Sequence, residues 1–342
     1  MLEKLKAFLK RKDIVFSARR YGIDALGAMA QGLFASLLIG TIVGTIGTQF
    51  GVEWLVEIGD FAKAVAGIAM AIAIGYALHC PPLVLFSLCA VGYAANALGG
   101  AGGPLAVLIV TCVSAELGKA VSKETPIDIL VTPLVTILSG SILSILCAPY
   151  IGIAASSVGQ AIMWATELHP FLMGIIVSVI VGVALTLPIS SAAICAALGL
   201  TGLAGGAAVA GCCAQMVGFA VISFRENKWS GIVAQGLGTS MLQMGNIVKK
   251  PVIWVAPTLA AAVVGPLSTC IFKLECVGLN AGMGTCGLVG PLGVLTAMKF
   301  STESFIGVLL LCVLAPAVLS LAFNEIMRKL GWIKTGDMQL DL

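Results

Sequence analysis

The chain has 342 residues, of which 59% are hydrophobic and only 10% charged, and its formal net charge at pH 7 is +3. A soluble globular domain has about 25% charged residues, so this composition excludes that class. A helix needs about 20 mostly apolar residues to cross a bilayer, and the 41 glycines and 13 prolines suit membrane helices. The sequence predicts an all-α polytopic membrane protein with about ten transmembrane helices plus re-entrant hairpins.

The first 20 residues, MLEKLKAFLKRKDIVFSARR, lack the continuous apolar core of a signal peptide. Apolar residues in positions 2–9 recur at nearly helical spacing against basic ones, which predicts a short amphipathic helix on the inner membrane surface. A basic tail that only fixes the orientation of the chain is the alternative. We expect a cytoplasmic N-terminal segment (1–20), one membrane-embedded domain (21–325) and a short cytoplasmic tail (326–342).

Ten apolar segments follow in chain order. The positive-inside rule supports ten spans with both termini in the cytoplasm, because only Lys63, Lys273 and Lys299 of the 19 basic residues then fall outside. Segment 150–166 is short and carries polar residues. The alternative to a membrane span there is a helix that lies along the membrane interface. The predicted spans are 24–47, 62–79, 82–98, 104–118, 127–148, 150–166, 170–190, 203–224, 252–272 and 303–325.

Three stretches are poor candidates for continuous helices. Residues 231–250 are too polar, residues 276–298 are too rich in glycine, and TLPISSAA (Thr186 to Ala193) places two hydroxyls after a proline. Irregular backbone inside a membrane is tolerated only where protein or a water-filled cavity covers it. Transporters use such broken helices to bind substrate near the midplane. We therefore predict re-entrant hairpins over the first two stretches and a helix break in the third.

No pattern in the sequence supports a cofactor. The eleven cysteines form no CxxC pair and lack neighbouring metal ligands, so we expect them to be reduced and structural. GMGTCG (Gly282 to Gly287) matches GxGxxG but lacks the strand and the acid of a dinucleotide site, while GTIVG (Gly40 to Gly44) and GLAGG (Gly202 to Gly206) suggest helix contacts only. Most acids lie near span ends, where they offer no deep carboxylate pair. No metal, cofactor, nucleic-acid partner or catalytic residue is predicted.

The polar residues that remain inside apolar surroundings are uncharged. Carboxamides and hydroxyls both donate and accept hydrogen bonds, which suits a neutral, polyhydroxylated solute. Hydrogen bonding between helices is the alternative for any one of them. His169 opens the span HPFLMGIIVSVIVGVALTLP, where it either caps the helix or donates to a ligand. The predicted substrate-binding residues are Asn96, His169, Ser190, Ser191, Gln215, Gln243, Asn246 and Asn280.

Three stretches resemble the membrane (EIIC) component of bacterial sugar phosphotransferase systems, in its fructose-like branch. They are SAELGKAVSKETPIDILVTPLVTILSG, HPFLMGIIVSVIVGVALTLPISSAA and MVGFAVISFRENKWSGIVAQGLGTSMLQMGNIVKKPVIWVAPTLAAAVVGPL. The resemblance covers most of residues 24–325 and is nearest to the stand-alone, perfringolysin-regulator-like branch, which shares the IDALGAMAQGLFASLLIGTI type of start. It implies a homodimer in the lipid of a bacterial cytoplasmic membrane, with a scaffold and an elevator-type transport subdomain in each subunit and cytoplasmic phosphotransferase proteins as candidate partners.

The resemblance also implies a departure from the family. At the substrate hairpin the family carries an acid, in a Thr-Glu-Gly-type motif, which binds the hydroxyl to be phosphorylated. This chain has SMLQMGN there, so Gln243 or Asn246 stands near that place. A carboxamide can hold a hydroxyl but cannot accept its proton.

The leading hypothesis is a transporter rather than an enzyme. It is a permease that binds and translocates a small, sugar-like solute, with or without phosphorylating it. One alternative is a membrane-embedded sensor or regulator derived from such a transporter. Another is a phosphorylating permease served by separate proteins, because the tail after Glu325 is too short for a phosphoryl-carrying domain.

Overall fold

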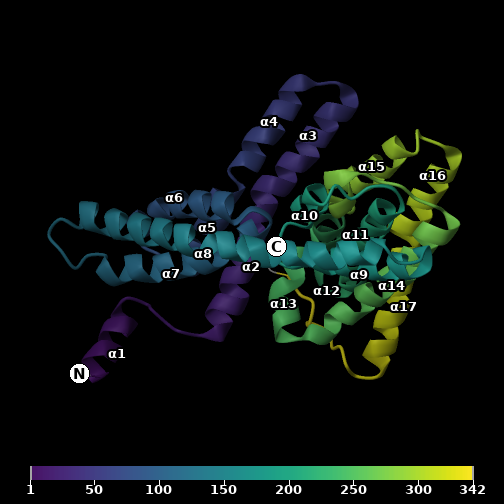
Figure 1. Ribbon diagram of the computed structural model, residues 1–342. Coiled ribbons are helices and arrows are strands. Elements are labelled where there is room, and N and C mark those ends of the chain that lie inside the picture. Colours follow the sequence, from purple (N-terminus) through teal and green to yellow (C-terminus); the bar gives the residue numbers. More distant parts are fainter. Residues whose placement is uncertain (1, 341–342) are drawn as a thin grey trace. The chain divides into compact units, whose positions relative to one another are not determined.

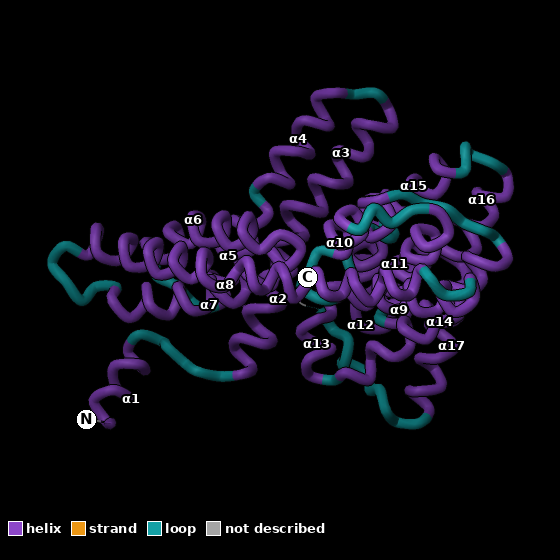
Figure 2. The backbone as a smooth tube through the Cα atoms, viewed as in Figure 1, coloured by secondary structure: helices purple, strands orange, loops and turns teal. Residues whose placement is uncertain are grey.

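The computed structural model describes the backbone of residues 2–340, and within these residues every regular element is a helix (Figures 1 and 2). Met1 and residues 341–342, at the ends of the predicted N-terminal segment and tail, lie outside the described residues, as do the side chains of Leu2, Lys4 and Leu5. The chain divides into two compact units. The first contains the chain up to Leu37 and Phe61–Ala154, and the second contains Leu38–Asp60 and the chain from Ala155 onwards.

Six described segments are long and apolar enough to cross a membrane, or up to seven when the bent pair Glu53–Ala64 and Ala66–Ala77 counts as one span. The shorter apolar helix Pro170–Thr186 falls in the predicted span 170–190. An all-α, polytopic membrane protein is thereby confirmed. The six segments are Arg20–Phe50, Pro82–Val121, Asp128–Thr166, Gly202–Ile222, Pro251–Ile271 and Thr302–Lys329.

The first unit is a helical bundle in which α5, α6 and α7 pack against one another and α2 packs on α5. Gly100 (φ 50°) makes the turn between α6 and α7. The predicted N-terminal helix is present as α1, and its place on the inner membrane surface stays a prediction. The bounds are α1 Leu2–Arg11, α2 Leu26–Leu33, α5 Ala66–Ala77, α6 Pro82–Gly99 and α7 Gly103–Val121.

Helix α8 (Asp128–Thr166) runs without interruption through two predicted spans, 127–148 and 150–166. Pro149 lies inside the helix, so the boundary predicted there is wrong. Membrane helices tolerate an internal proline where neighbouring groups satisfy the freed carbonyl. At about 1.5 Å per residue the helix is roughly 58 Å long, about twice the thickness of a bilayer's hydrocarbon core.

Near the end of α1, a hydrogen-bonded network joins separate parts of the first unit. Arg20 Nη2 donates to Asp13 Oδ2 at 2.6 Å, and His79 Nδ1 lies 3.1 Å from the same oxygen. The buried Lys119 ammonium donates to the Asp13 carbonyl oxygen at 2.7 Å and pairs with Glu116 at 3.0 Å. The hydrogen bond from Arg20, together with the contact to His79 and nearby positive charge, lowers the pKa of Asp13 to about 2.

The second unit is built around α11, which packs against α9, α14 and α17 and is buried over nearly its whole length. Small residues allow the close approach: a Cβ on Gly182 of α9 would lie 2.7 Å from the carbonyl oxygen of Gly211 on α11. The bounds are α3 Ile39–Phe50, α4 Glu53–Ala64, α9 Pro170–Thr186, α10 Ser191–Ala197, α11 Gly202–Ile222, α12 Phe224–Val233, α13 Met244–Lys249, α14 Val255–Pro266, α15 Val289–Ala297, α16 Thr302–Val308 and α17 Ala315–Lys329.

The two GxxxG stretches take part in close backbone packing. A Cβ on Gly59 of α4 would lie 2.6 Å from the carbonyl oxygen of Gly40 on α3, which confirms the helix contact predicted for GTIVG. In GLAGG, Gly206 instead packs against the backbone of Leu274, in the non-helical chain after the turn Leu267–Ile271.

Candidate functional site

The first predicted helix break lies between α9 and α10 and follows from the local sequence. Pro188 has no amide hydrogen, and it holds Leu187 in an extended conformation (ψ 158°) at the end of α9. Ser190 then accepts a hydrogen bond from the Ala193 amide at 3.2 Å and caps α10.

The second break interrupts the polar stretch 231–250. After α12 one more helical turn follows, over Ala234–Gly238. Thr239 is then extended (φ −159°), and its side chain accepts a hydrogen bond from the Met241 amide at 3.1 Å. The short α13 ends at Lys249, before Pro251 starts the next span. No continuous helix crosses this stretch, as predicted, and its arrangement as a re-entrant hairpin stays a prediction.

The third break interrupts the glycine-rich stretch 276–298. Gly278, Gly284 and Gly287 have positive φ values of 56°, 56° and 50°, which residues with a side chain rarely adopt. Only short helical turns form before α15 begins at Val289. The predicted interruption is therefore present, and the glycines form irregular turns.

Hydrogen bonds connect each of these breaks to the other two, and we call their meeting point the junction. All three breaks belong to the second unit, although they are far apart in sequence. The connecting bonds are Thr186 Oγ1 with Ser240 Oγ (2.7 Å), Ser191 Oγ to the Gly282 carbonyl (2.7 Å) and Thr285 Oγ1 to the Gly236 carbonyl.

Gln215, at the centre of α11, completes one side of the junction. Its carbonyl oxygen accepts from the Trp254 indole at 3.0 Å and from the Thr186 hydroxyl at 3.4 Å. Its amide donates to the Thr258 hydroxyl at 3.1 Å. Gln215 is fully buried, so these bonds satisfy a polar group that burial would otherwise destabilise.

Three carboxamides form a second buried network, which we call the carboxamide cluster: Gln235, Gln243 and Asn246. Gln243 Nε2 donates to Gln235 Oε1 at 3.0 Å, and Asn246 Nδ2 donates to Gln243 Oε1 at 2.9 Å. Gln235 Nε2 in turn donates to the Ser223 hydroxyl at 2.9 Å. Asn246 is 8% exposed, and Gln235 and Gln243 are fully buried.

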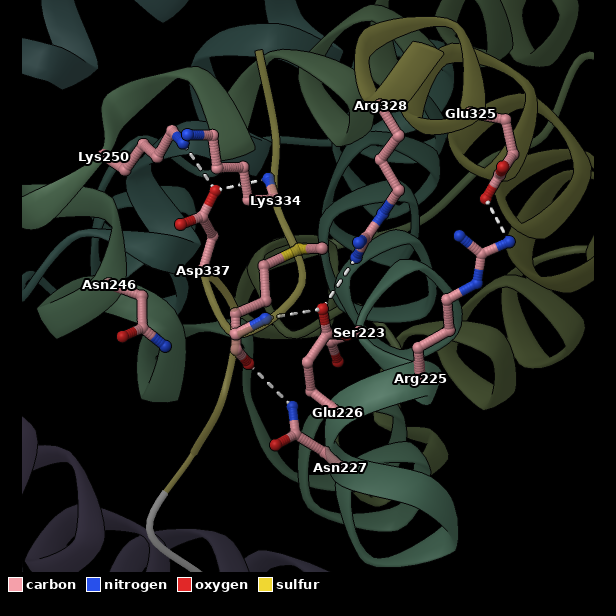
Figure 3. Close-up of polar contacts among 12 residues, drawn as sticks. Ser223, Arg225, Glu226, Asn227, Asn246, Lys250, Glu325, Arg328, Lys334 and Asp337 are labelled. Atoms are coloured by element: carbon pink, nitrogen blue, oxygen red, sulfur yellow. Dashed lines mark hydrogen bonds and ion pairs between the residues drawn. The ribbon is translucent and has the colours of Figure 1, made fainter. Parts of the chain in front are cut away.

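The tail segment, Ile333–Leu340, lies against the carboxamide cluster. Helix α17 ends in a turn in which Gly331 has φ 75° and the Trp332 amide bonds to the Met327 carbonyl at 3.0 Å. The chain then folds back, with the side chains of Ile333 and Met338 buried. Figure 3 shows it passing beside α12 and Asn246.

The backbone of the tail segment accepts hydrogen bonds from the predicted site residues. The Met338 carbonyl accepts from Gln243 Nε2 at 3.0 Å and from Asn227 Nδ2 at 2.8 Å. The Gln339 carbonyl accepts from Asn246 Nδ2 at 2.8 Å. These contacts could not be expected from the sequence, because about 90 residues separate their partners.

Two of the predicted site residues lie apart from the junction, and one lies at its edge. His169 is exposed at the start of α9, roughly 25 Å of helix from Thr186. Asn96 belongs to the first unit, where it packs between Gly67 and Gly103 of α5 and α7. Asn280 lies in the third break, against Gly293.

Several polar residues of the junction, of the carboxamide cluster and of the contacts with the tail segment were absent from the sequence-based prediction. All of them lie in a predicted break or within eight residues of one, so the hydroxyls and carboxamides near a break are the local signal for them. For Trp254 the residue type itself indicates a polar contact, because a buried indole N–H needs an acceptor. The additional residues are Thr186, Ser223, Asn227, Gln235, Ser240, Trp254, Thr258 and Thr285.

Comparison with known proteins identifies the family. The sequence model described as "Phosphotransferase system, EIIC" matches residues 23–340, which cover most of both units and include the tail segment. Searches of curated proteins and of solved structures each gave no match. The chain therefore belongs to the EIIC family of the phosphotransferase system.

Proposed function

We propose that this EIIC protein is a permease that binds a small, neutral, sugar-like solute between the junction and the carboxamide cluster, which share the second break. One observation carries the proposal: three helix breaks, distant in sequence, are hydrogen-bonded together within one unit. Helix ends leave backbone donors and acceptors without helical partners, and transporters place such ends around their substrates.

The chemistry of the surrounding side chains suits an uncharged ligand. The segment Thr239–Asn246 contains no acid and no base, and its carboxamides and hydroxyls can both donate to and accept from sugar hydroxyls. Glu226, a buried acid of the same unit, is paired with Arg328 at 2.8 Å. No unpaired charge of this network therefore has to be neutralised by the ligand, and an uncharged solute suits the site.

We assign the transport subdomain to the second unit and the scaffold to the first. The residues of the junction and of the carboxamide cluster belong to the second unit, so a site that moves with this unit keeps its internal contacts. The proposal includes a homodimer in the bacterial cytoplasmic membrane with both termini inside. Crosslinking in native membranes tests the dimer, and labelling of cysteines introduced near each terminus tests the orientation.

A thermal-shift screen of the purified protein tests the binding function. Free hexoses, hexitols, sugar phosphates and nucleosides are compared, because a ligand that binds only the folded state raises stability by RT ln(1 + [L]/Kd). We expect a shift with a free sugar or polyol, and a weaker shift in Gln243→Ala and Asn246→Ala. Gln49→Ala, which removes an exposed carboxamide of α3, is the matched control. A shift with sugar phosphates alone would refute the neutral-solute site.

A membrane-embedded sensor is a second candidate function. The observation in its favour is that Gln243 and Asn246 contact the tail segment, so a solute at these carboxamides would alter contacts outside the junction. In such a sensor the basic N-terminal segment is the candidate contact for a cytoplasmic partner. Deleting residues 2–12 should therefore abolish signalling and leave solute affinity intact. Unchanged signalling after this deletion would count against the sensor.

A further inference from the structure

The amide hydrogens of Gln243 and Asn246 are fully used in this structure. Each carboxamide has two N–H donors. Gln243 donates to Gln235 and to the Met338 carbonyl, and Asn246 donates to Gln243 and to the Gln339 carbonyl. Half of these donors are therefore bonded to the tail segment. A solute hydroxyl can accept from them only after the tail segment has left.

Further contacts hold the tail segment in this position. The Asn227 side chain pairs with the tail backbone in both directions, because Nδ2 donates to Met338 and Oδ1 accepts from the Leu340 amide at 2.8 Å. The Lys250 ammonium lies 2.6 Å from the Asp337 carboxylate, and the Gly336 amide bonds to Glu226 at 3.3 Å (Figure 3).

Asp337 also stabilises a turn inside the tail segment. Its Oδ2 accepts from the Lys334 amide at 2.6 Å, which closes a tight turn. Burial alone would raise the pKa of Asp337, but the hydrogen bonds from Lys250 and from the Lys334 amide outweigh burial and lower it. The carboxylate therefore keeps its charge, and its pairing with Lys250, throughout the neutral pH range.

We propose that the tail segment is a releasable strap that occupies the solute-binding carboxamides, so that strap docking and solute binding exclude each other. The inference rests on the proposed function of the junction. It adds that the ion pair between Lys250 and Asp337 sets how often the strap opens. This pair is partly exposed, with side-chain exposures of 31% and 21%, so breaking it shifts the docking equilibrium without unfolding the unit.

The proposal makes a quantitative link between two measurements. When a site is available only in a minor open state, the apparent affinity falls by the fraction of molecules that are open. A variant that opens the strap should therefore increase strap exchange and solute affinity by the same factor. Solute added to the wild type should speed exchange of the strap amides.

The test is hydrogen exchange by mass spectrometry on residues 333–340 of the full-length protein, combined with sugar binding. Lys250→Glu replaces the ion pair with repulsion, and Lys249→Glu makes the same charge change at the exposed neighbouring lysine. We expect Lys250→Glu to speed strap exchange about fivefold to tenfold and to tighten binding of the hexose or hexitol equally. Lys249→Glu should match the wild type in both.

A second variant guards against an indirect effect of the charge change. Deleting residues 333–342 removes the strap and should tighten sugar binding at least as much as Lys250→Glu. Equal affinity in the wild type, in Lys250→Glu and in the deletion variant would overturn the strap while leaving the proposed function intact. Faster exchange without tighter binding, or no change in exchange, would also overturn it. Sugar binding by none of the forms would overturn the proposed function, and the strap with it.

Discussion

Gln243 shows how tightly the polar side chains of the second unit depend on one another. Its amide faces two acceptors, Gln235 Oε1 and the Met338 carbonyl, while its oxygen accepts from Asn246. The residue is fully buried. The orientation of this one carboxamide is therefore fixed by three neighbours, and a change in its donor pattern affects all of them.

Gln243→Glu should destabilise the protein at neutral pH. The carboxylate would place a negative oxygen against two acceptors that now receive hydrogen bonds, at a cost of about 1–3 kcal/mol in the free energy of unfolding. The loss should shrink at low pH, because a protonated carboxyl can donate one bond. Denaturant unfolding in detergent micelles measures both effects, with Gln49→Glu as the exposed control. Equal stability of wild type and variant at neutral pH would contradict the orientation described for Gln243.

Asp13 gives the first unit a pH dependence with a defined direction. Its pKa is about 2 in the folded protein, against 3.8 for an unperturbed aspartate, so the ionised form is the one that the fold stabilises. Its contribution is complete above the unfolded value and is lost as the pH falls towards the folded value. The stability difference between wild type and Asp13→Asn should therefore shrink as the pH falls from 3.8 to about 2. Thermal unfolding across this range provides the measurement, and a difference that grows on acidification would refute it.

At the scale of elements, two ion pairs join α12 to α17, and they differ in burial. Arg328 and Glu226 lie 2.8 Å apart with side-chain exposures of 8% and 2%, whereas Arg225 and Glu325 lie 3.0 Å apart with exposures of 59% and 40% (Figure 3). A buried charge that loses its partner is strongly unfavourable, while an exposed pair contributes little. The inner pair is therefore the one that fixes these two helices and the start of the tail segment.

The same Glu→Gln change at the two pairs tests this difference. Glu226→Gln should lower the free energy of unfolding by about 3–5 kcal/mol, because Arg328 stays charged and buried. Glu325→Gln should cost less than about 1 kcal/mol. Denaturant unfolding of both variants under the same conditions makes the comparison, and similar losses would show that burial does not separate the two pairs.

The elements also show which features can be predicted from sequence. The breaks after Thr186 and around Gly284 could be predicted, because proline removes a helical hydrogen bond and glycine permits positive φ locally. The continuity of α8 through Pro149 could not, since it depends on neighbouring groups that compensate the lost bond. Ser190, Ser191 and Gln243 were found through their breaks, whereas the contact between Gln243 and Met338 links positions 95 residues apart and leaves no local pattern.

At the scale of the whole molecule, the candidate site and the N-terminal network belong to different units. Every hydrogen bond that builds the junction joins residues of the second unit. The contacts of Asp13 with Arg20, His79 and Lys119 are internal to the first. In these two networks each unit therefore keeps its own polar contacts, which supports the proposed division into a transport and a scaffold subdomain.

Reconstitution of the purified protein into liposomes tests the complete transport cycle. We expect exchange of labelled free sugar across the membrane without added phosphotransferase proteins, and we expect recovered sugar to stay unphosphorylated when those proteins are supplied. Phosphoryl transfer to a hydroxyl is assisted by a base that takes its proton; Gln243 and Asn246 provide none, and Glu226 is already paired with Arg328. Protein-free liposomes control for leakage, and Gln243→Glu supplies a carboxylate at the same position. Sugar phosphate formed by the wild type would refute this account and identify a phosphorylating permease served by separate proteins.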